Sequence, residues 1–406
     1  MGKVMIKLMI VSFCVCITFS GCRNRNEHKF SVSTNNHFDS DRIYYLNFED
    51  NLKNAPIDTF TINSIAKNIT FIPLETSAEA LLTVVDLRVA SVDGSFYVSS
   101  MAGSRFSGII EFDSTGHFKD YLVRIGRGPK ELPSWFQWSY NNNERLLSAY
   151  ASSEVLLHSF ARNSTNKYDI GYFANCRPLN DGTIVGLPNI TGTGDTVTPY
   201  LRFLNQEGDV MKSLYYPKKR NIDYDIMATQ GRDVGPMEAY CLYPSYSGDA
   251  LFQDMYNDTI YRVSSIDDIK PYIILGRGSL APNVKEALDK AAKAKRVTIR
   301  RLLEAENYIF IVYQYRDMHY SAIWDKRNST LIANMETDFF KIPVINNLGF
   351  TKYRTPTGIE IFVGLSGCFD DKLYGVLRAD QAMDFISGIR EDDNPVLMVI
   401  ELINFN

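Results

Sequence analysis

Two glycine-rich stretches are the first candidates for chemistry: RIGRGPKEL, Arg124–Leu132, and ILGRGSL, Ile274–Leu280. A phosphate-binding loop needs Gly-x4-Gly-Lys-Ser/Thr at the start of a helix, whose N–H groups bind the anion. Here proline, lysine and glutamate follow the second glycine of the first stretch, and the third glycine of a dinucleotide-binding fingerprint is absent. The repeated Gly-Arg-Gly triplet therefore favours a corner that the fold needs, where the chain leaves an outer strand. At such a corner glycine permits a positive φ, and the arginine can pack across the seam to the next sheet and bond carbonyls or a carboxylate. Anion binding by Arg127 or Lys130 is the alternative.

A second candidate is WFQWSY, Trp135–Tyr140, which holds two of the three tryptophans of the chain. These rings could form a platform for a sugar or for an apolar patch of a partner, or they could fill the core between sheets. Residues three apart in a strand face opposite sides, so only one of Trp135 and Trp138 needs to be core. Both interpretations stay open, and these tryptophans join Arg127 and Lys130 as candidate ligand or partner contacts.

No catalytic or metal-binding grouping is evident. The five histidines are scattered, and none has the HExxH spacing of zinc enzymes. No Gly-x-Ser-x-Gly elbow occurs, although a Ser-His-Asp triad assembled from distant positions stays open. We therefore predict no catalytic residue, no cofactor and no metal ligand.

The N-terminus predicts export. Lys3 and Lys7 precede an apolar run, Leu8–Phe19, which is shorter than the ~20 residues that a membrane-spanning helix needs. FSGC, ending at Cys22, resembles a bacterial lipobox, in which cleavage precedes the cysteine and its thiol takes a diacylglycerol. An ordinary secretory peptide is the alternative. We expect residues 1–21 to be a lipoprotein signal peptide and acylated Cys22 to anchor the protein in a lipid bilayer.

The next segment, residues 22–60, is expected to be a tether and lead-in, because its first half is polar and rich in Asn and Ser. Three cysteines lie beyond it: Cys176, Cys241 and Cys368. They are widely spaced and odd in number, so buried small apolar side chains are the simplest interpretation. One disulfide among them stays open.

Strand-like runs recur in six pairs between turn residues. The pairs are 95–100 with 108–118, 145–150 with 154–160, 182–187 with 200–210, 249–254 with 258–264, 307–315 with 320–328, and 372–378 with 395–403. This repeat fits propeller blades of ~40–50 residues with insertions. We predict an all-β, six-bladed β-propeller over residues 61–406, with one inserted helix at about 281–295.

Charge gives two further indications. The net charge is −4, and this mild acidity argues against a nucleic-acid partner. A basic run lies on the predicted helix and the strand after it: Lys290, Lys293, Lys295, Arg296, Arg300 and Arg301. It is typical of a solvated helix face, and contact with an acidic partner or lipid phosphates is the alternative.

The chain resembles the six-bladed β-propeller lipoproteins of Bacteroidota, a group of NHL/TolB-like propellers. The motifs that carry the resemblance are FIPLET at 71–76, RIGRGPKE at 124–131 and NPVLMVIEL at 394–402. The family usually has Gly or Glu where Lys130 stands. The resemblance covers essentially the whole mature chain. It implies a ring closed by pairing the N-terminal strand ITFIPLE with the last strand, and no catalytic residue.

From these observations we expect a monomeric, non-enzymatic binding or scaffold module for a glycan, a peptide or an envelope protein. Arg23, rather than an aspartate retention signal, follows Cys22, so the outer membrane is the expected location. A lyase or hydrolase with its site in the central channel is the alternative function, because propellers host both binders and enzymes.

Overall fold

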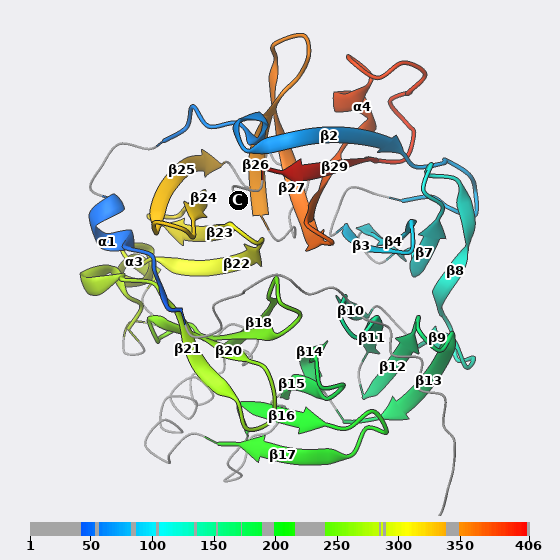
Figure 1. Ribbon diagram of the computed structural model, residues 1–406, viewed down its shortest axis with the longest axis horizontal. Coiled ribbons are helices and arrows are strands. Elements are labelled where there is room, and N and C mark those ends of the chain that lie inside the picture. Colours follow the sequence, from blue (N-terminus) through cyan, green and yellow to red (C-terminus); the bar gives the residue numbers. More distant parts are fainter. Residues whose placement is uncertain are drawn as a thin grey trace, which may run out of the picture. The chain divides into compact units, whose positions relative to one another are not determined.

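The computed structural model arranges six large β-sheets around a central axis (Figure 1). Asp41–Asn406 form one compact unit. The structure describes residues 42–52, 57–82, 87–102, 105–133, 136–151, 153–171, 173–188, 199–215, 240–283, 286, 290–337 and 349–403. No helix in these ranges is both long enough and apolar enough to cross a membrane. The predicted six-bladed propeller is confirmed.

The first three blades use their strands in chain order from the axis outward (Figure 1). Blade one contains β3 (Arg88–Val92), β4 (Ser95–Ser99), β7 (Ile109–Phe112), β8 (Phe118–Ile125) and β9 (Glu131–Leu132), beside a small hairpin of β5 (Met101–Ala102) and β6 (Arg105–Phe106). Blade two contains β10 (Gln137–Asn141), β11 (Leu146–Ala151), β12 (Glu154–Ser159) and β13 (Ser164–Asp169). Blade three contains β14 (Phe173–Pro178), β15 (Ile184–Pro188), β16 (Leu201–Leu204) and β17 (Val210–Leu214).

The last three blades follow the same order, and two of them recruit a strand from the N-terminal part of the chain. Blade four contains β18 (Tyr240–Pro244), β19 (Ala250–Asp254), β20 (Thr259–Val263), β21 (Ile269–Ile274) and, parallel to β21, β1 (Tyr44–Tyr45). Blade five contains β22 (Thr298–Glu304), β23 (Tyr308–Tyr315), β24 (Met318–Asp325) and β25 (Thr330–Thr337). Blade six contains β26 (Gly349–Arg354), β27 (Glu360–Phe369), β28 (Lys372–Leu377), β29 (Val396–Leu402) and β2 (Ala66–Pro73).

The six predicted pairs of runs form neighbouring strands inside the blades. They are β4 with β7, β11 with β12, β15 with β16, β19 with β20, β23 with β24, and β28 with β29. These strands carry the most continuous apolar sequence because the core lies between adjacent blades. One such core cluster contains Ala90 and Tyr97 of blade one with Trp138 and Leu147 of blade two. The hydrophobic core is therefore divided among the interfaces between neighbouring blades.

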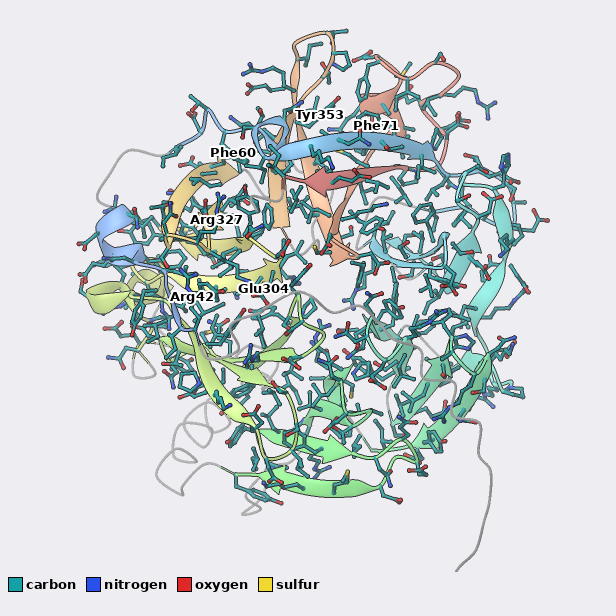
Figure 2. The ribbon with its side chains drawn as sticks, in the orientation of Figure 1. Arg42, Phe60, Phe71, Glu304, Arg327 and Tyr353 are labelled. Atoms are coloured by element: carbon teal, nitrogen blue, oxygen red, sulfur yellow. The ribbon has the colours of Figure 1, made fainter. Side chains whose placement is uncertain are left out.

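The expected closure of the ring is also confirmed. β2 pairs antiparallel with β29, with Phe71 opposite Met398. The Phe71 ring lies 5.5 Å from that of Tyr353 and 5.4 Å from that of Phe385, centroid to centroid (Figure 2). An N-terminal strand thus completes the last blade, and its pairing with β29 joins the two ends of the propeller chain.

The segment before β2 also contacts the propeller. After β1, the short helix α1 (Phe48–Asn51) begins at Asn47, whose side chain accepts from the Asp50 N–H. Phe48 is 2% exposed, and its ring lies 5.2 Å from Tyr313 and 5.6 Å from Trp324. The turn η1 (Ile62–Ser64) then leads into β2. Residues 42–52 are therefore part of the packed domain.

The helix expected at about 281–295 is found only in part. Residues 281–283 are not helical, and α3 covers Lys290–Ala294. Before it, η4 (Gly278–Leu280) makes a single turn, and the Leu280 carbonyl accepts from the Val297 N–H at 2.8 Å. This bond places Val297 beside Leu280. The insertion therefore leaves and rejoins the propeller at neighbouring residues. A further short helix, α4 (Ala379–Ala382), follows β28.

Candidate functional site

A cavity of about 490 Å³ lies on the axis between the inner strands of the blades. Every blade contributes to its wall, since the inner strands converge there (Figure 1). Representative side chains are Arg88 on β3, Trp138 on β10, Arg177 on β14, Tyr243 on β18, Arg301 on β22 and Phe369 on β27. This volume falls within the ~300–1,000 Å³ typical of small-molecule sites.

One end of the cavity is closed by turns from blades two, four and six. We call the turns at 142–145, 245–248 and 370–371 the closing loops. Three contacts join them: Asn143 Nδ2 donates to the Ser247 carbonyl at 2.7 Å, Asn142 Nδ2 donates to Asp370 Oδ1 at 2.6 Å, and the Tyr246 hydroxyl donates to Asp371 Oδ1. Asn142, Tyr246 and Asp370 also line the cavity, so the closing loops form its end wall.

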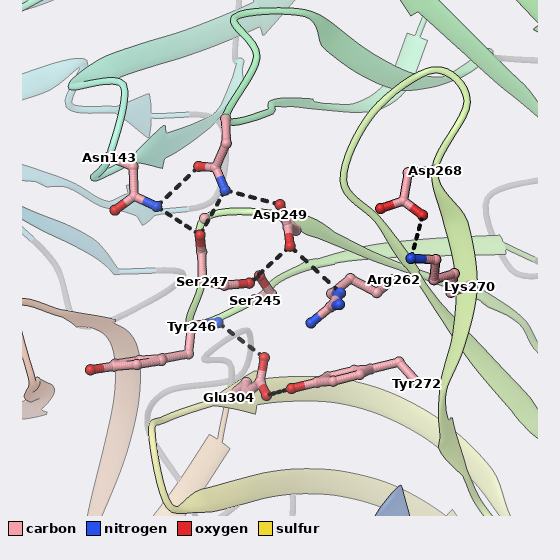
Figure 3. A network of polar contacts seen from close by, with 12 residues as sticks. Asn143, Ser245, Tyr246, Ser247, Asp249, Arg262, Asp268, Lys270, Tyr272 and Glu304 are labelled. Carbon is pink, nitrogen blue, oxygen red and sulfur yellow. Dashed lines mark hydrogen bonds and ion pairs between the residues drawn. The ribbon is translucent and has the colours of Figure 1, made fainter. Parts of the chain in front are cut away.

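Glu304 supports this end wall from blade five (Figure 3). Glu304 as a residue is 2% exposed. Its carboxylate accepts from the Tyr246 N–H at 3.0 Å and from the Tyr272 hydroxyl, and it pairs with Lys326 Nζ at 2.6 Å. Burial and the neighbouring Glu304 charge raise the pKa of Tyr272. Because its oxygens are engaged in the wall, Glu304 acts as a structural anion that holds the Tyr246 loop.

Asp249 and Arg262 form a second buried ion pair, which lies near Glu304 (Figure 3). Asp249 lies 3.7 Å from Arg262, accepts from the Ser247 hydroxyl at 2.9 Å and from Asn180 Nδ2 at 3.0 Å. Burial raises the pKa of Asp249. The closing loop of blade four is therefore bonded to Asn180 of blade three, and its neighbour Asp249 is paired with Arg262 within blade four.

Three arginines on the cavity wall come from alternate blades: Arg88 from blade one, Arg177 from blade three and Arg301 from blade five. Arg88 and Arg177 each reach the inner strand of the next blade, where they donate to the carbonyls of Trp138 and Leu242 at 3.1 Å. Their stems are thus held in place between neighbouring blades.

The sequence predictions did not identify these arginines. Arg301 belonged to the basic run that was predicted to be a solvated face. In the structure the arginines of that run have different surroundings. Arg296 pairs with Glu286 at 2.7 Å, Arg300 donates to Gln314 at 2.6 Å, and Arg301 lines the cavity. The available signal was position: each cavity arginine lies in the segment just before the first apolar run of a unit.

Of the two tryptophans predicted as contacts, the structure describes Trp138. Trp138 is 5% exposed, packs in the core between blades one and two, and donates from Nε1 to Ser99 Oγ at 2.7 Å. It is therefore a core residue that also lines the cavity. Trp135 and Cys22 lie outside the described residues.

The two Gly-Arg-Gly triplets do follow the outer strands β8 and β21, as predicted. Their arginines differ. Arg277 is fully buried, pairs with Asp258 at 2.6 Å and donates to the carbonyls of Met255, Asn257 and Val297. Arg127 and Lys130 are exposed. The prediction of a seam arginine thus holds for Arg277, while Arg127 stands on the surface.

The glycines of the triplets also differ. Gly276 and Gly278 have φ values of +54° and +50°, as a corner requires, whereas the first triplet does without a positive φ. At Gly126 a Cβ would overlap the Glu131 carboxylate, which accepts from the Gly128 N–H at 2.8 Å. Space, rather than backbone freedom, explains glycine there, which corrects the expectation of a shared positive φ.

Cys176, Cys241 and Cys368 are free thiols. Burial raises the pKa of each, that of Cys368 to about 12. They are therefore protonated and weakly nucleophilic at neutral pH. Within the described ranges, no group of three or more His, Cys, Asp or Glu side chains is placed to hold a metal ion.

Comparison with known proteins gives a family and a fold. The sequence model of the family described as "Domain of unknown function (DUF4934)" matches residues 43–401. No curated protein matches the chain. The crystal structure of a "putative exported protein" from Bacteroides fragilis NCTC 9343 has 17% identity and a TM-score of 0.61, with 89% of this chain and 100% of that one covered.

Two further solved structures are more distant. A member of the DUF4221 family from Bacteroides vulgatus ATCC 8482 has 12% identity and a TM-score of 0.46, with 84% of this chain and 97% of that one covered. Virginiamycin B lyase from Staphylococcus aureus has 10% identity and a TM-score of 0.39, with 83% and 99% covered.

Proposed function

The chain belongs to the DUF4934 family, and from its geometry we propose that it is a binding protein of the cell envelope that holds a ligand in its axial cavity. The ligand would be a glycan or peptide fragment, or a segment of an envelope protein. Acylated Cys22 would anchor the protein in the outer membrane, with residues 22–60 as tether and lead-in. The protein would act as a monomer without catalysis.

One observation carries the binding role. The cavity is closed at one end by hydrogen-bonded loops and is lined by polar and aromatic side chains of all six blades. Among the residues that the structure describes, Glu304 is the glutamate that lines the cavity, and it is already paired with Lys326, which supports a role of the wall in contact and orientation. Arg127 and Lys130, which are exposed in the turn after β8, stay candidate partner contacts.

The first experiment is native mass spectrometry of the full-length protein, released from its own membrane in mild detergent. We expect a protein peak with a bound small molecule, which solvent extraction would identify. A ligand-free peak at all detergent conditions would argue against a stably occupied cavity. A ligand recovered in cleaved form would favour the alternative, a lyase or hydrolase.

The anchor can be tested separately. The resemblance to a lipobox and the description of a structurally similar chain as exported both support it. We expect the Cys22→Ser variant to move from the membrane fraction to the soluble fraction and to lose incorporation of labelled fatty acid. Cys176→Ser, which alters a buried thiol of the propeller, is the control and should stay in the membrane. Equal membrane retention of both variants would contradict the anchor.

A further inference from the structure

The first described residues of the lead-in, 42–52, cover the outer edge of blade four, and we call them the N-terminal clip. In the clip, β1 adds in parallel to the outer strand β21. The main chain continues this pairing beyond β1, because the Leu46 N–H donates to the Ile274 carbonyl at 2.8 Å. In the sequence the clip lies between Cys22, the expected anchor, and β2. It is therefore the described part of the domain that is nearest in sequence to that anchor.

The second Gly-Arg-Gly triplet provides the seat of the clip. A Cβ on Gly276 would come within 3.2 Å of the Asn47 Cα, and a Cβ on Gly278 would overlap the Glu49 carboxylate. That carboxylate accepts from the Ser279 hydroxyl at 2.7 Å. Both glycines thus leave the space that the clip occupies, and the residue after the triplet binds a carboxylate from 230 positions away in the chain.

The clip also contacts the network that holds the end wall of the cavity. Tyr44 is 6% exposed, and its ring packs edge-on against that of Tyr272, with the centroids 5.3 Å apart. Lys326 Nζ lies over the Tyr44 ring, 5.0 Å from its centroid. The Glu304 carboxylate accepts from the Tyr272 hydroxyl and pairs with Lys326 at 2.6 Å. Tyr44 therefore supports two side chains that fix Glu304.

Glu304 connects this contact to the cavity (Figure 3). Its carboxylate accepts from the Tyr246 N–H at 3.0 Å, and Tyr246 lines the cavity within the closing loop 245–248. One continuous series of contacts thus runs from Tyr44 of the clip through Glu304 to Tyr246. A loss of packing at one end of this series therefore weakens the hold on the closing loop at the other end.

The clip is suited to open independently of the blades. It is built from a two-residue strand and a four-residue helix at the edge of the domain. Short peripheral elements open at a lower free energy than central strands. Opening of the clip would remove the Tyr44 contacts without breaking the sheet of any blade. An element with a docked and an open state is what two distant sites need in order to be coupled.

We propose that the N-terminal clip regulates the axial cavity. When the clip is docked, Tyr44 and Glu49 keep the closing loop of blade four in place, and when the clip opens, the end wall loosens and the ligand is held less tightly. The proposal rests on the binding function proposed above and adds its regulation. Coupling between two sites is reciprocal, so a ligand that contacts Tyr246 would in turn favour the docked clip. Tyr44 is then a positioning residue, since it acts on the cavity through Glu304.

Hydrogen exchange of the full-length protein in detergent tests this coupling without a ligand. Tyr44→Ala and Glu49→Ala should each accelerate exchange at 245–248 by about tenfold, which lies within the usual range of coupling between sites. The turn 205–209 of blade three is the internal reference, because the same pair of main-chain hydrogen bonds closes both turns. Exchange at 205–209 should stay as it is in the unmodified protein.

Two further variants of the clip serve as controls. Tyr44→Phe keeps the ring and should exchange slowly at 245–248. Tyr45→Ala changes the neighbouring tyrosine, which is 59% exposed, and should leave this loop as in the unmodified protein. Thermal unfolding checks that each variant is folded. Glu49→Ala, at the other end of the clip, decides the question if Tyr44→Ala does not fold.

The proposal is overturned if folded Tyr44→Ala and Glu49→Ala exchange at 245–248 like the unmodified protein. It is also overturned if 205–209 accelerates to the same extent, because that result would indicate a general loss of stability.

Native mass spectrometry then measures the effect on the ligand. The ratio of ligand-bound to ligand-free protein should be about tenfold lower in Tyr44→Ala than in Tyr45→Ala. An equal ratio in the two variants would overturn the regulation of the cavity. An empty unmodified protein would instead count against the binding function, and the exchange measurement would still decide whether the clip and the end wall are coupled.

Discussion

At the scale of single residues, the two identical triplets show how neighbours decide what an arginine does. Arg277 faces Asp258 and three carbonyls in the seam between blades four and five, whereas Arg127 is exposed after blade one. The same Gly-Arg-Gly sequence therefore buries its arginine at one position and exposes it at the other. Position in the repeat could be predicted from sequence, but the partner of each side chain could not, because it comes from elsewhere in the chain.

This contrast predicts unequal effects of one substitution. Arg277→Met should lower the free energy of unfolding by about 3 kcal/mol, because it leaves Asp258 and buried carbonyls without their donor. Arg127→Met, in the matched triplet, should change it by about 0.5 kcal/mol or less. Urea unfolding of the two variants measures both effects. A similar loss in both would contradict the assignment of Arg277 as the seam residue.

The buried side chain of His158 leads to a prediction of how the stability of the fold depends on pH. His158 is 4% exposed, and its Nδ1 lies 2.9 Å from Thr165 Oγ1. Burial, followed by the charge of Lys130, lowers the pKa of His158 in the folded state below its usual value of ~6.5. The neutral ring is therefore favoured by folding, and this stability is present above pH ~6.5 and lost as pH falls toward the folded pKa.

We expect the free energy of unfolding to fall between pH 7 and pH 5.5, and His158→Gln to reduce that slope. The slope should not vanish, since burial also lowers the pKa of His319. His117→Gln, which alters an exposed turn, is the control and should leave the slope unchanged. Parallel curves for His158→Gln and the unmodified protein would show that His158 does not contribute.

At the scale of elements, the central strands were predictable and the inner strands were not. Each predicted pair has continuous apolar sequence on both sides, because both faces pack against neighbouring blades. An inner strand such as β14 instead alternates core residues like Cys176 with cavity residues like Asn175 and Arg177. Its mixed pattern resembles a loop. For this reason Arg88, Arg177 and Arg301 were missed, whereas Trp138 of the inner strand β10 was already among the predicted contacts.

The lead-in segment gives the prediction at this scale. Phe48 is 2% exposed and packs against Tyr313 and Trp324 of blade five, although it belongs to the lead-in, whose described part contains the strand β1 and the helix α1. Phe48→Ala should lower the free energy of unfolding by about 3 kcal/mol through the lost packing and the cavity left behind. Tyr45→Ala, whose side chain is 59% exposed, should cost far less. Chemical denaturation measures both, and equal small effects would mean that the lead-in contributes no packing.

At the scale of the whole molecule, function depends on contacts that only ring closure creates. The wall arginines come from blades one, three and five, and the closing loops come from blades two, four and six. The residues of each set are separated by scores of positions in the chain, so spacing in the sequence carries no sign of their meeting. The repeat predicts that a central cavity exists, and the three-dimensional ring determines what lines it.

The closing loops provide the last prediction. Asn142→Ala and Tyr246→Phe each remove one bond between alternate blades, to Asp370 and Asp371 respectively. Each of these donors bonds a carboxylate, and such a bond contributes about 1.5 kcal/mol, so local opening should become about tenfold more frequent per lost bond. Hydrogen exchange should therefore accelerate at 142–145, 245–248 and 370–371 and stay unchanged in the central strands. Asn328→Ala, which removes the side-chain oxygen that accepts from the Thr330 hydroxyl in an outer turn, should not accelerate exchange at these loops. Acceleration throughout all blades would instead mean that the three contacts stabilise the whole ring rather than the end wall of the cavity.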